Sequence, residues 1–280
     1  MSFIKICIGL MSICPMLLSK PAVVPTLNGQ LGNQMFEIAA ALSIALDHDA
    51  ELTVPDLNLT QWGIPQNKEA VFWRIHSFLP NTALSVYVEP EFRYSPIPYS
   101  PNMRIQGFFQ SEKYFAKHKE AIIDIFSPKQ SILDDLTERY SEIVDHPESV
   151  AIHIRTYIKD DPTHAFYHLN GREYVKRAME YFPENAYYIV FSDNIPWCKQ
   201  ELAGLSQNMR FMEGDSYLND FYLMTLCKNH IISNSSFSWW AAYLNRDPNK
   251  LVIAPIKWFT ERVGHNTCDL IPDEWILIDN

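Results

Sequence analysis

The sequence is short of positive charge and of organised cysteines, and each shortage excludes a class of protein. Its 280 residues include 23 lysines and arginines against 33 acidic residues, which gives a formal net charge of −10. Such a chain lacks the basic field that holds a polyanion, so we expect no nucleic-acid partner. The five cysteines are odd in number and show no CxxC spacing, which argues against a zinc site and against a disulfide framework.

Familiar nucleotide-binding motifs are missing as well. No GxGxxG segment follows a predicted strand, which disfavours a dinucleotide-binding oxidoreductase, and there is no Walker loop. We find no internal repeat and no low-complexity tract. By contrast, 47% of the residues are hydrophobic and 13% are aromatic, which is enough to bury a large core in one big domain or two compact ones.

An apolar run occupies residues 3–18 and carries a single lysine and a proline. It is long enough for the core of a signal peptide but short for a membrane span, and Ser19-Lys20-Pro21-Ala22 is a poor cleavage site. A peripheral membrane anchor or a misplaced start codon fits about equally well. We therefore expect residues 1–20 to be a signal or membrane-anchor segment, and the protein to be cytoplasmic or membrane-associated.

Strand-like and helix-like patterns alternate along the chain, most regularly after residue 147. The first part predicts strands at 22–27 and 51–54, helices at 33–46, 111–126 and 127–144, and an aromatic, loop-rich stretch at 55–101. The second part predicts strands at 150–154, 187–191, 210–212, 230–233 and 251–254, with helices at 172–182, 197–202, 217–228 and 237–244. This alternation favours an α/β fold with parallel strands, in which ligands lie beyond the carboxyl ends of the strands.

Polar residues follow the first strand and the strand at 150–154. Gly32, Asn33 and Gln34 open a helix, and a tight turn capped by Asn33 explains them at least as well as a ligand does. His153 lies within the strand at 150–154, where packing is at least as good an explanation as ligand contact. Arg155 ends that strand and places a permanently charged guanidinium where a ligand is expected.

Two further strand ends carry side chains suited to a nucleotide. Asp193 follows the strand at 187–191, where it suits either a nucleoside or the cap of the next helix. The strand at 230–233 leads to a helix mouth rich in hydroxyls, which predicts a phosphate site because helix N-termini attract anions. Asp220 lies sixteen positions before Ser236, and its spacing alone assigns it no role. The residues of the helix mouth are Asn234, Ser235, Ser236, Phe237 and Ser238.

Five segments, taken together, resemble the bacterial α-1,2-fucosyltransferases of glycosyltransferase family 11, which are galactoside 2-α-L-fucosyltransferases. Their order along the chain and the length of the last one carry the resemblance, which covers nearly everything after residue 22. The segments are GQLGNQMF at 29–36, GFFQSEKYF at 107–115, HIR at 153–155, FSD at 191–193 and NDFYLMTLCKNHIISNSSFSWWAAYL at 219–244.

The resemblance implies a GT-B-like α/β fold of two Rossmann-like domains. We place an N-terminal acceptor-side domain at residues 21–147 and a C-terminal domain that binds GDP-fucose at 148–280. The resemblance also implies an inverting, metal-independent enzyme without a cofactor. Its predicted reaction moves L-fucose from GDP-fucose to the 2-hydroxyl of a galactose-terminated glycan.

The resemblance also assigns roles to the residues at the strand ends. It gives Arg155 to the donor diphosphate, with His153 in the same strand, and Asp193 and Asp220 to the nucleoside region. It gives the turn at 234–238 to phosphate. It places Gly32, Asn33 and Gln34 across the cleft, near the fucose, with Asn33 as a catalytic candidate.

One segment departs from the family pattern, which commonly reads His-x-Arg-Arg-Gly-Asp-Tyr. This chain has Thr156, Tyr157 and Ile158 after Arg155, so the second arginine and the acidic residue are missing in register. We expect Arg155 and the turn at 235–238 to stabilise the charge on departing GDP, and Asp160 or Asp161 to act as the general base. Two alternatives stay open: another nucleotide-sugar transferase of this fold, and an inactive member that binds glycans.

Overall fold

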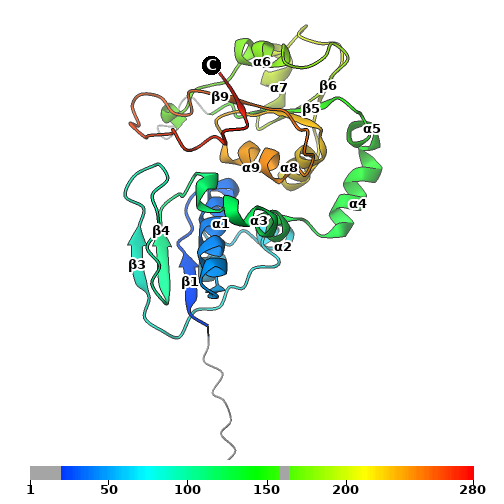
Figure 1. The fold of residues 1–280 in the computed structure, drawn as a ribbon. Helices are drawn as coiled ribbons and strands as arrows, with labels where there is room; N and C mark the ends of the chain where they lie inside the picture. The colour runs from blue at the N-terminus through cyan, green and yellow to red at the C-terminus, as the bar shows by residue number, and fades with distance from the viewer. Residues whose placement is uncertain (1–19, 158–163) are drawn as a thin grey trace, which may run out of the picture.

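The computed structural model describes residues 20–157 and 164–280, which form an α/β fold built on two parallel sheets (Figure 1). The apolar run at residues 3–18 and the base candidates Asp160 and Asp161 lie outside the described residues. Within the described ranges, no helix has both the length and the apolar character needed to cross a bilayer.

The N-terminal half holds a four-stranded sheet in the order β2-β1-β4-β3. The long helix α1 (Leu31–Asp47) packs on this sheet and is also covered by α9 and α3. It is therefore buried around most of its circumference, and three consecutive alanines, Ala39, Ala40 and Ala41, are all buried. The strands are β1 (Ala22–Pro25), β2 (Glu51–Leu52), β3 (Ser85–Val88) and β4 (Met103–Gln106).

The C-terminal half holds a six-stranded sheet in the order β10-β9-β8-β5-β6-β7. Its central strand β5 is buried along its whole length, as expected for a parallel strand that is covered on both faces. The strands are β5 (Ser149–Ile154), β6 (Tyr187–Ser192), β7 (Met209–Phe211), β8 (Asn229–Ile231), β9 (Val252–Pro255) and β10 (Ile276–Ile278).

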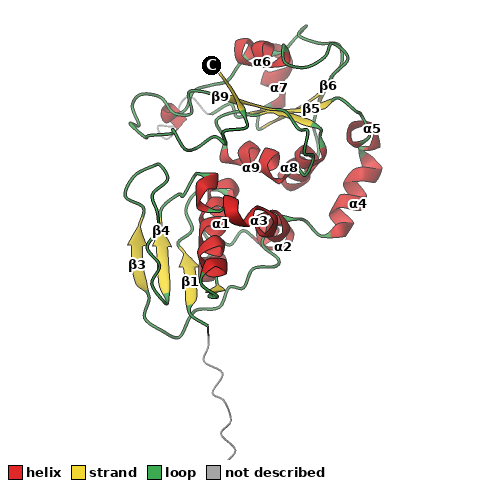
Figure 2. Ribbon diagram, viewed as in Figure 1, coloured by secondary structure: helices red, strands yellow, loops and turns green. Residues whose placement is uncertain are grey.

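Helices cover both faces of the larger sheet, with α8 and α9 on the face toward the N-terminal half and α6 and α7 on the other (Figure 2). The α-helices after α1 are α2 (Pro65–Ala70), α3 (Lys119–Phe126), α4 (Gln130–Arg139), α5 (Ser141–Val144), α6 (Arg172–Met179), α7 (Ile195–Glu201), α8 (Tyr217–Leu226) and α9 (Ser236–Leu244). The 3₁₀ turns are η1 (Pro55–Asn58), η2 (Glu112–Tyr114), η3 (Ala116–His118) and η4 (His164–Phe166).

The expected alternation of strands and helices after residue 147 is confirmed, with β10 as an additional strand. The N-terminal half differs more from the sequence prediction. The stretch predicted as loops contains α2 and β3, and β4 follows directly after it. The helix expected at 111–126 begins only at Lys119, because Ser111 caps a 3₁₀ turn through a hydrogen bond from the Lys113 N–H. The next expected helix is broken at Tyr140 into α4 and α5.

The two halves share one hydrophobic core, because α9 packs directly against α1. The rings of Trp239 and Trp240 lie 4.5 and 4.9 Å from the ring of Phe36 on α1. Phe115 stacks on Trp240 at 5.4 Å. Each of the two predicted domains holds one of the sheets. Separating the two halves would expose this aromatic cluster to water.

Candidate active site

A cavity of about 1280 Å³ is lined by residues from both halves. The lining includes the segments that follow β1, β3, β4, β5, β6, β8 and β9, so the carboxyl ends of strands from both sheets face the cavity. Pockets for one small ligand commonly measure about 300 to 1,000 Å³. This cavity therefore has room for two substrates at once.

Arg155 lies at the carboxyl end of β5 and lines the cavity. Its Nη1 pairs with Oδ2 of Asp193 at 3.2 Å. The other carboxylate oxygen of Asp193 accepts hydrogen bonds from the N–H and the hydroxyl of Thr156, at 2.9 and 3.1 Å. Two neighbouring strand ends thus orient the guanidinium, which remains 41% exposed and keeps N–H groups for a ligand.

His153 lies in β5, two residues before Arg155, and its ring lines the cavity. Its Nδ1 is 3.0 Å from the hydroxyl oxygen of Ser233, and its ring contacts Phe237 at 5.5 Å. Burial lowers the pKa of His153 to about 4, because the charged form loses its hydration. At neutral pH the positive charge beside this strand end therefore belongs to Arg155.

Helix α9 begins at Ser236, and its N-terminus faces the cavity. The preceding residue, Ser235, does not cap the helix with its side chain, so first-turn N–H groups stay available. An uncapped N-terminus attracts anions through these groups and through the helix dipole. Ser235, Ser236 and Phe237 line the cavity, whereas Ser238 is buried and its hydroxyl donates to the carbonyl of Ser235.

Asn234 is buried and holds together the loops around the cavity. Its Nδ2 donates to the carbonyls of His168 and Trp258, at 2.9 and 2.8 Å. Its Oδ1 accepts from Asn170 at 3.2 Å, and its carbonyl accepts from the Tyr157 hydroxyl at 2.7 Å. Because both of its N–H groups and its side-chain oxygen already bond within the protein, Asn234 positions the turn that precedes α9.

The N-terminus of α1 lies directly beside that of α9. The indole N–H of Trp240 donates to the Gly32 carbonyl at 3.0 Å. The side-chain oxygen of Asn33 accepts from the Ser236 hydroxyl and from Nε2 of Gln110, each at 2.9 Å. Gly32 and Asn33 both line the cavity, so two helix N-termini present their positive ends to it.

Gln34 lies behind this surface and outside the cavity lining. It is buried, and its Nε2 donates to the carbonyls of Gly29 and Trp62, at 3.3 and 3.4 Å. Gly29 has a φ of +66°, a left-handed conformation that glycine adopts without strain. Gln34 therefore supports the turn that carries Gly32 and Asn33 into the cavity.

Replacing Gly32 with alanine should destabilise the protein by about 1 to 2 kcal/mol. Alanine favours a helix over glycine by up to about 1 kcal/mol, but overpacking costs about 1 to 3 kcal/mol. A Cβ at this position would lie 2.5 Å from the Ser236 carbonyl carbon and 2.8 Å from the Phe237 nitrogen. Both are backbone atoms that cannot turn away, so the clash outweighs the helix preference.

Urea unfolding measures this free energy, with Gly171→Ala as the matched control. At Gly171 an added Cβ would meet the end of the Glu201 side chain at 3.0 Å and the Trp197 ring at 3.8 Å, and no backbone atom is among these nearest neighbours. We expect the control to stay within about 0.5 kcal/mol of the unchanged protein. A Gly32→Ala protein as stable as the control would show that α1 and α9 are not in tight contact here.

Asp220 reaches the cavity from the first turn of α8. Its carboxylate accepts no hydrogen bond from any residue in the described ranges, although it is half-buried. Burial, together with the nearby charge of Asp215, raises the pKa of Asp220 to about 6. When this carboxylate is ionised, N–H donors of a ligand would replace the hydration that it has lost.

The structure adds lining residues that the strand-end positions did not single out. Gln110 belongs to the segment GFFQSEKYF, which contributes to the family resemblance but was assigned no function from it. Arg262 brings a second guanidinium from the loop after β9, and nothing in its sequence context marked it. The cavity also exposes several rings that come from separate loops: Phe92, Phe108, Tyr157, Phe166, Tyr167, Phe259 and His265.

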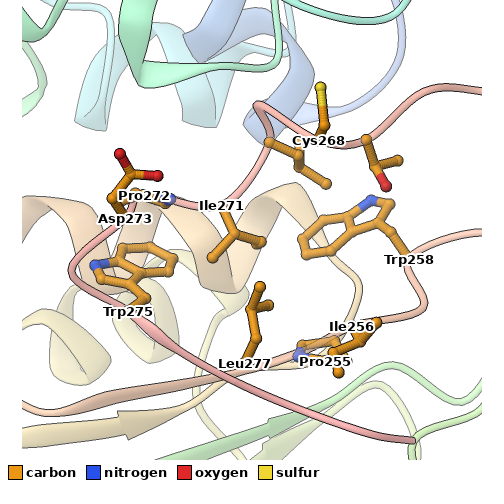
Figure 3. Close-up of a pocket in the computed structure, with 11 residues that line it drawn as sticks. Pro255, Ile256, Trp258, Cys268, Ile271, Pro272, Asp273, Trp275 and Leu277 are labelled. Atoms are coloured by element: carbon orange, nitrogen blue, oxygen red, sulfur yellow. The ribbon is translucent and has the colours of Figure 1, made fainter.

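A second, smaller pocket of about 350 Å³ lies under the segment between β9 and β10. Figure 3 shows Ile271 between the indole rings of Trp258 and Trp275. Thr267 and Asp273 also line the pocket, so its lining is both apolar and polar. Neither pocket contains a ready metal site: within residues 20–157 and 164–280, no three His, Cys, Asp or Glu side chains are grouped to hold an ion.

Comparison with known proteins relates the chain to glycosyltransferases. The family model for glycosyl transferase family 11 matches residues 20–279. The chain is 31% identical over 289 residues to an α-1,2-colitosyltransferase of Escherichia coli, an alignment that covers 92% of this chain and 99% of that enzyme. It is 26% identical to human galactoside α-(1,2)-fucosyltransferase 1, over 78% of this chain and 64% of the human protein.

The fold also matches a solved fucosyltransferase. The α-1,6-fucosyltransferase NodZ of Bradyrhizobium, crystallised with GDP, superposes with a TM-score of 0.53 at 13% sequence identity. The match covers 80% of this chain and 92% of NodZ. The expected GT-B-like α/β fold is therefore confirmed.

Proposed function

Because the chain belongs to glycosyl transferase family 11, and is a glycosyltransferase related to fucosyltransferases, we propose that it transfers L-fucose from GDP-fucose to the 2-hydroxyl of a β-galactoside. The observation that carries this proposal is the meeting of Arg155 with the uncapped N-terminus of α9 in one cavity. Both features suit a diphosphate, and the protein as a whole is acidic. In this proposal Arg155 and the first-turn N–H groups of α9 form a local binding site for an anionic ligand.

In this proposal the donor lies mainly in the C-terminal half, residues 148–280. Asp220 accepts the N1 and N2 hydrogens of guanine, a pairing that needs an ionised carboxylate. Asp193 orients Arg155 and keeps a lone pair for a ribose hydroxyl, since a carboxylate has about four acceptor positions. The N-terminal half, residues 21–147, brings Asn33 and Gln110 to the acceptor side of the cavity.

The reaction is a direct displacement with inversion at the anomeric carbon. The 2-hydroxyl of galactose attacks that carbon, and the bond to the β-phosphate oxygen of GDP breaks on the opposite face. Negative charge then grows on the departing diphosphate, where Arg155 and the first turn of α9 stabilise it through preorganised donors. The proton of the attacking hydroxyl passes to a general base, for which Asp160 and Asp161 remain the candidates.

The donor sugar has one well-motivated alternative. The similarity to an α-1,2-colitosyltransferase extends over 99% of that enzyme. Colitose is fucose without its 3-hydroxyl, so both donors present the same 6-methyl group and the same anomeric centre. The chain's departure from the family pattern at Thr156 lies beside Asp193 and Arg155, and it fits an altered donor site as well as an altered rate.

A ligand-induced thermal shift tests which nucleotide the donor carries. We expect GDP and GDP-fucose to raise the melting temperature, and UDP to leave it unchanged, because ligands stabilise only the folded state that binds them. Equal stabilisation by UDP would make the protein a different nucleotide-sugar transferase. Release of GDP from GDP-fucose, or from GDP-colitose, then distinguishes an enzyme from an inactive glycan-binding relative.

Binding of GDP-fucose should strengthen as the pH rises through about 6 and level off above about 7. Below its pKa of about 6, Asp220 carries a proton and cannot accept both guanine N–H groups. The donor diphosphate is a diester that does not titrate in this range, so the change in affinity reports Asp220. Isothermal titration calorimetry between pH 5 and 8 measures it.

Asp220→Asn is the matched test of that assignment. We expect about 10- to 100-fold weaker binding of GDP-fucose at pH 7.5, since hydrogen bonds to charged groups contribute about 1.5 to 3 kcal/mol. The variant should also lose the rise in affinity around pH 6. If the variant keeps the same pH dependence as the unchanged protein, a different group titrates and Asp220 does not contact the base.

Turnover should continue in excess EDTA. A diphosphate that is held by Arg155 and by a helix N-terminus has its charge met without a divalent ion. Initial rates of GDP release, measured with EDTA and then with added magnesium or manganese, check this. Loss of activity on chelation, with recovery on adding either ion, would contradict metal independence.

A further inference from the structure

Six rings form a continuous series along the cavity, and the proposed reaction uses none of them. We call this series the aromatic wall. It consists of Phe92, Phe108, Tyr157, Tyr167, Phe259 and His265, all of which line the cavity.

The wall begins beside the proposed phosphate site. The Tyr157 ring centroid is 6.0 Å from the guanidinium carbon of Arg155. Tyr157 stacks on Tyr167 at 4.5 Å with an angle of 3° between the ring planes. Tyr167 in turn contacts Phe259 at 5.4 Å. These first three rings all come from the C-terminal half.

The wall then crosses into the N-terminal half. Phe259 contacts Phe92 edge to face at 5.4 Å. Phe92 stacks on His265 at 4.7 Å and also contacts Phe108 at 6.3 Å. The wall therefore leads away from Arg155 and ends at the loops after β3 and β4.

The rings that lie near the nucleoside side of the cavity form a different group. Phe237 contacts Phe221 of α8 at 5.1 Å and His153 at 5.5 Å. Asp220 is the neighbour of Phe221 on the same helix. No ring contact joins this group to the aromatic wall in the described residues, so we assign the wall to the other substrate.

The exposed end of the wall needs a partner with an apolar face. Phe108 lines the cavity, and 37% of its surface is exposed. Pyranose rings present a face of C–H groups, and aromatic rings bind such faces while leaving the hydroxyls free. A single pyranose covers only one or two rings. A wall of six rings is therefore longer than the terminal galactose requires.

We propose that the far end of the aromatic wall, at Phe92 and Phe108, is a subsite for the sugar that follows the terminal galactose. The inference rests on the proposed function for the identity of that galactose. The galactose lies at the Tyr157 end, close to the departing diphosphate, and the next sugar stacks beyond it. The acceptor is accordingly a glycan of at least two residues rather than a monosaccharide.

Isothermal titration calorimetry on the full chain saturated with GDP tests this subsite. The probes are methyl β-galactoside and methyl β-lactoside, which differ by one glucose. We expect the lactoside to bind about tenfold more tightly. Phe108→Ala should reduce lactoside affinity roughly fivefold to tenfold, toward the affinity for the galactoside, and should leave the galactoside and GDP affinities unchanged.

Two further variants show that the ring itself is responsible. Phe108→Trp keeps an aromatic face and should retain most of the lactoside preference. Phe78→Ala makes the same change at a phenylalanine that is 45% exposed but lies outside the cavity, and it should change neither sugar affinity.

Equal affinities for the two glycosides in the unchanged protein would overturn the subsite. So would a Phe108→Ala protein that binds GDP more weakly, because the wall would then belong to the donor. The measurement contains no fucose. A lactoside preference that depends on Phe108 would therefore support the subsite even if GDP-fucose proved to be the wrong donor.

Discussion

Arg155→Ala should lower kcat by roughly 100- to 1000-fold, and Arg155→Lys should lower it by nearly as much. The first loss corresponds to about 3 to 4 kcal/mol of transition-state stabilisation, the range found for single groups that stabilise a developing oxyanion. Lysine keeps the charge but loses the planar fork of donors, so it cannot hold Asp193 and two phosphate oxygens together. Contacts that strengthen as charge develops affect kcat more than the donor KM.

Steady-state kinetics of both variants check this, with circular dichroism to confirm that they fold. Arg246→Ala is the control, because that arginine is 54% exposed, lies outside the cavity and pairs with the surface acids Glu120 and Asp124. We expect its kcat to be unchanged. A folded Arg155→Ala enzyme within about tenfold of the unchanged protein, a difference of only about 1.4 kcal/mol, would mean that another group meets the phosphate.

Trp240→Ala should cost about 3 to 5 kcal/mol of folding free energy, the usual range for a large buried aromatic side chain. Trp240 is fully buried, contacts Phe36, Phe115 and Phe126, and donates to the Gly32 carbonyl. It joins α9 to the helices of the N-terminal half. Domains are stabilised by only about 5 to 15 kcal/mol, so this loss is a large fraction of the total.

Urea unfolding followed by circular dichroism and by tryptophan fluorescence measures the loss. Trp73→Ala is the matched control, since Trp73 is 40% exposed, and we expect it to cost less than about 1 kcal/mol. The shared core also predicts that both halves of the unchanged protein unfold in one transition. Separate transitions, or a Trp240→Ala protein as stable as the control, would mean that the halves are independent.

Most of the C-terminal sheet could be predicted because β5, β6 and β9 are largely buried apolar runs, whereas β10, a short strand at the edge of the sheet, was missed. The run Val150–Ile154 before Arg155 is a clear case. By contrast, β3 was missed because it is a four-residue edge strand in which Val86 and Val88 are exposed, so no alternation marks a buried face. The strand β4 was missed although buried Met103 and Ile105 alternate with Arg104 and Gln106, because only four residues carry the pattern.

The limits of prediction are similar within the cavity. The strand-end rule located Arg155, Asp193 and the turn before α9, since each depends on local sequence. It could not show that Ser238 points into the core or that Gln34 lies behind the cavity lining, because both depend on how α1 and α9 pack together. The raised pKa of Asp220 likewise follows from burial that only the folded chain provides.

The aromatic wall shows the same limit over longer distances. Phe92 and Phe259 are in contact although 167 positions separate them in the sequence. The aromatic character of the loop-rich stretch was visible in the sequence. Its partners in the C-terminal half were not, because no local pattern records a contact of that range.

The central claim is that this chain makes an α-1,2 bond between fucose and galactose. The most direct measurement incubates the protein with GDP-fucose and methyl β-lactoside and determines the product linkage by NMR spectroscopy. We expect one new α-fucosyl residue, attached to the 2-hydroxyl of galactose. A product linked at any other hydroxyl would contradict the claim, as would transfer from GDP-colitose alone or consumption of GDP-fucose without a glycoside product.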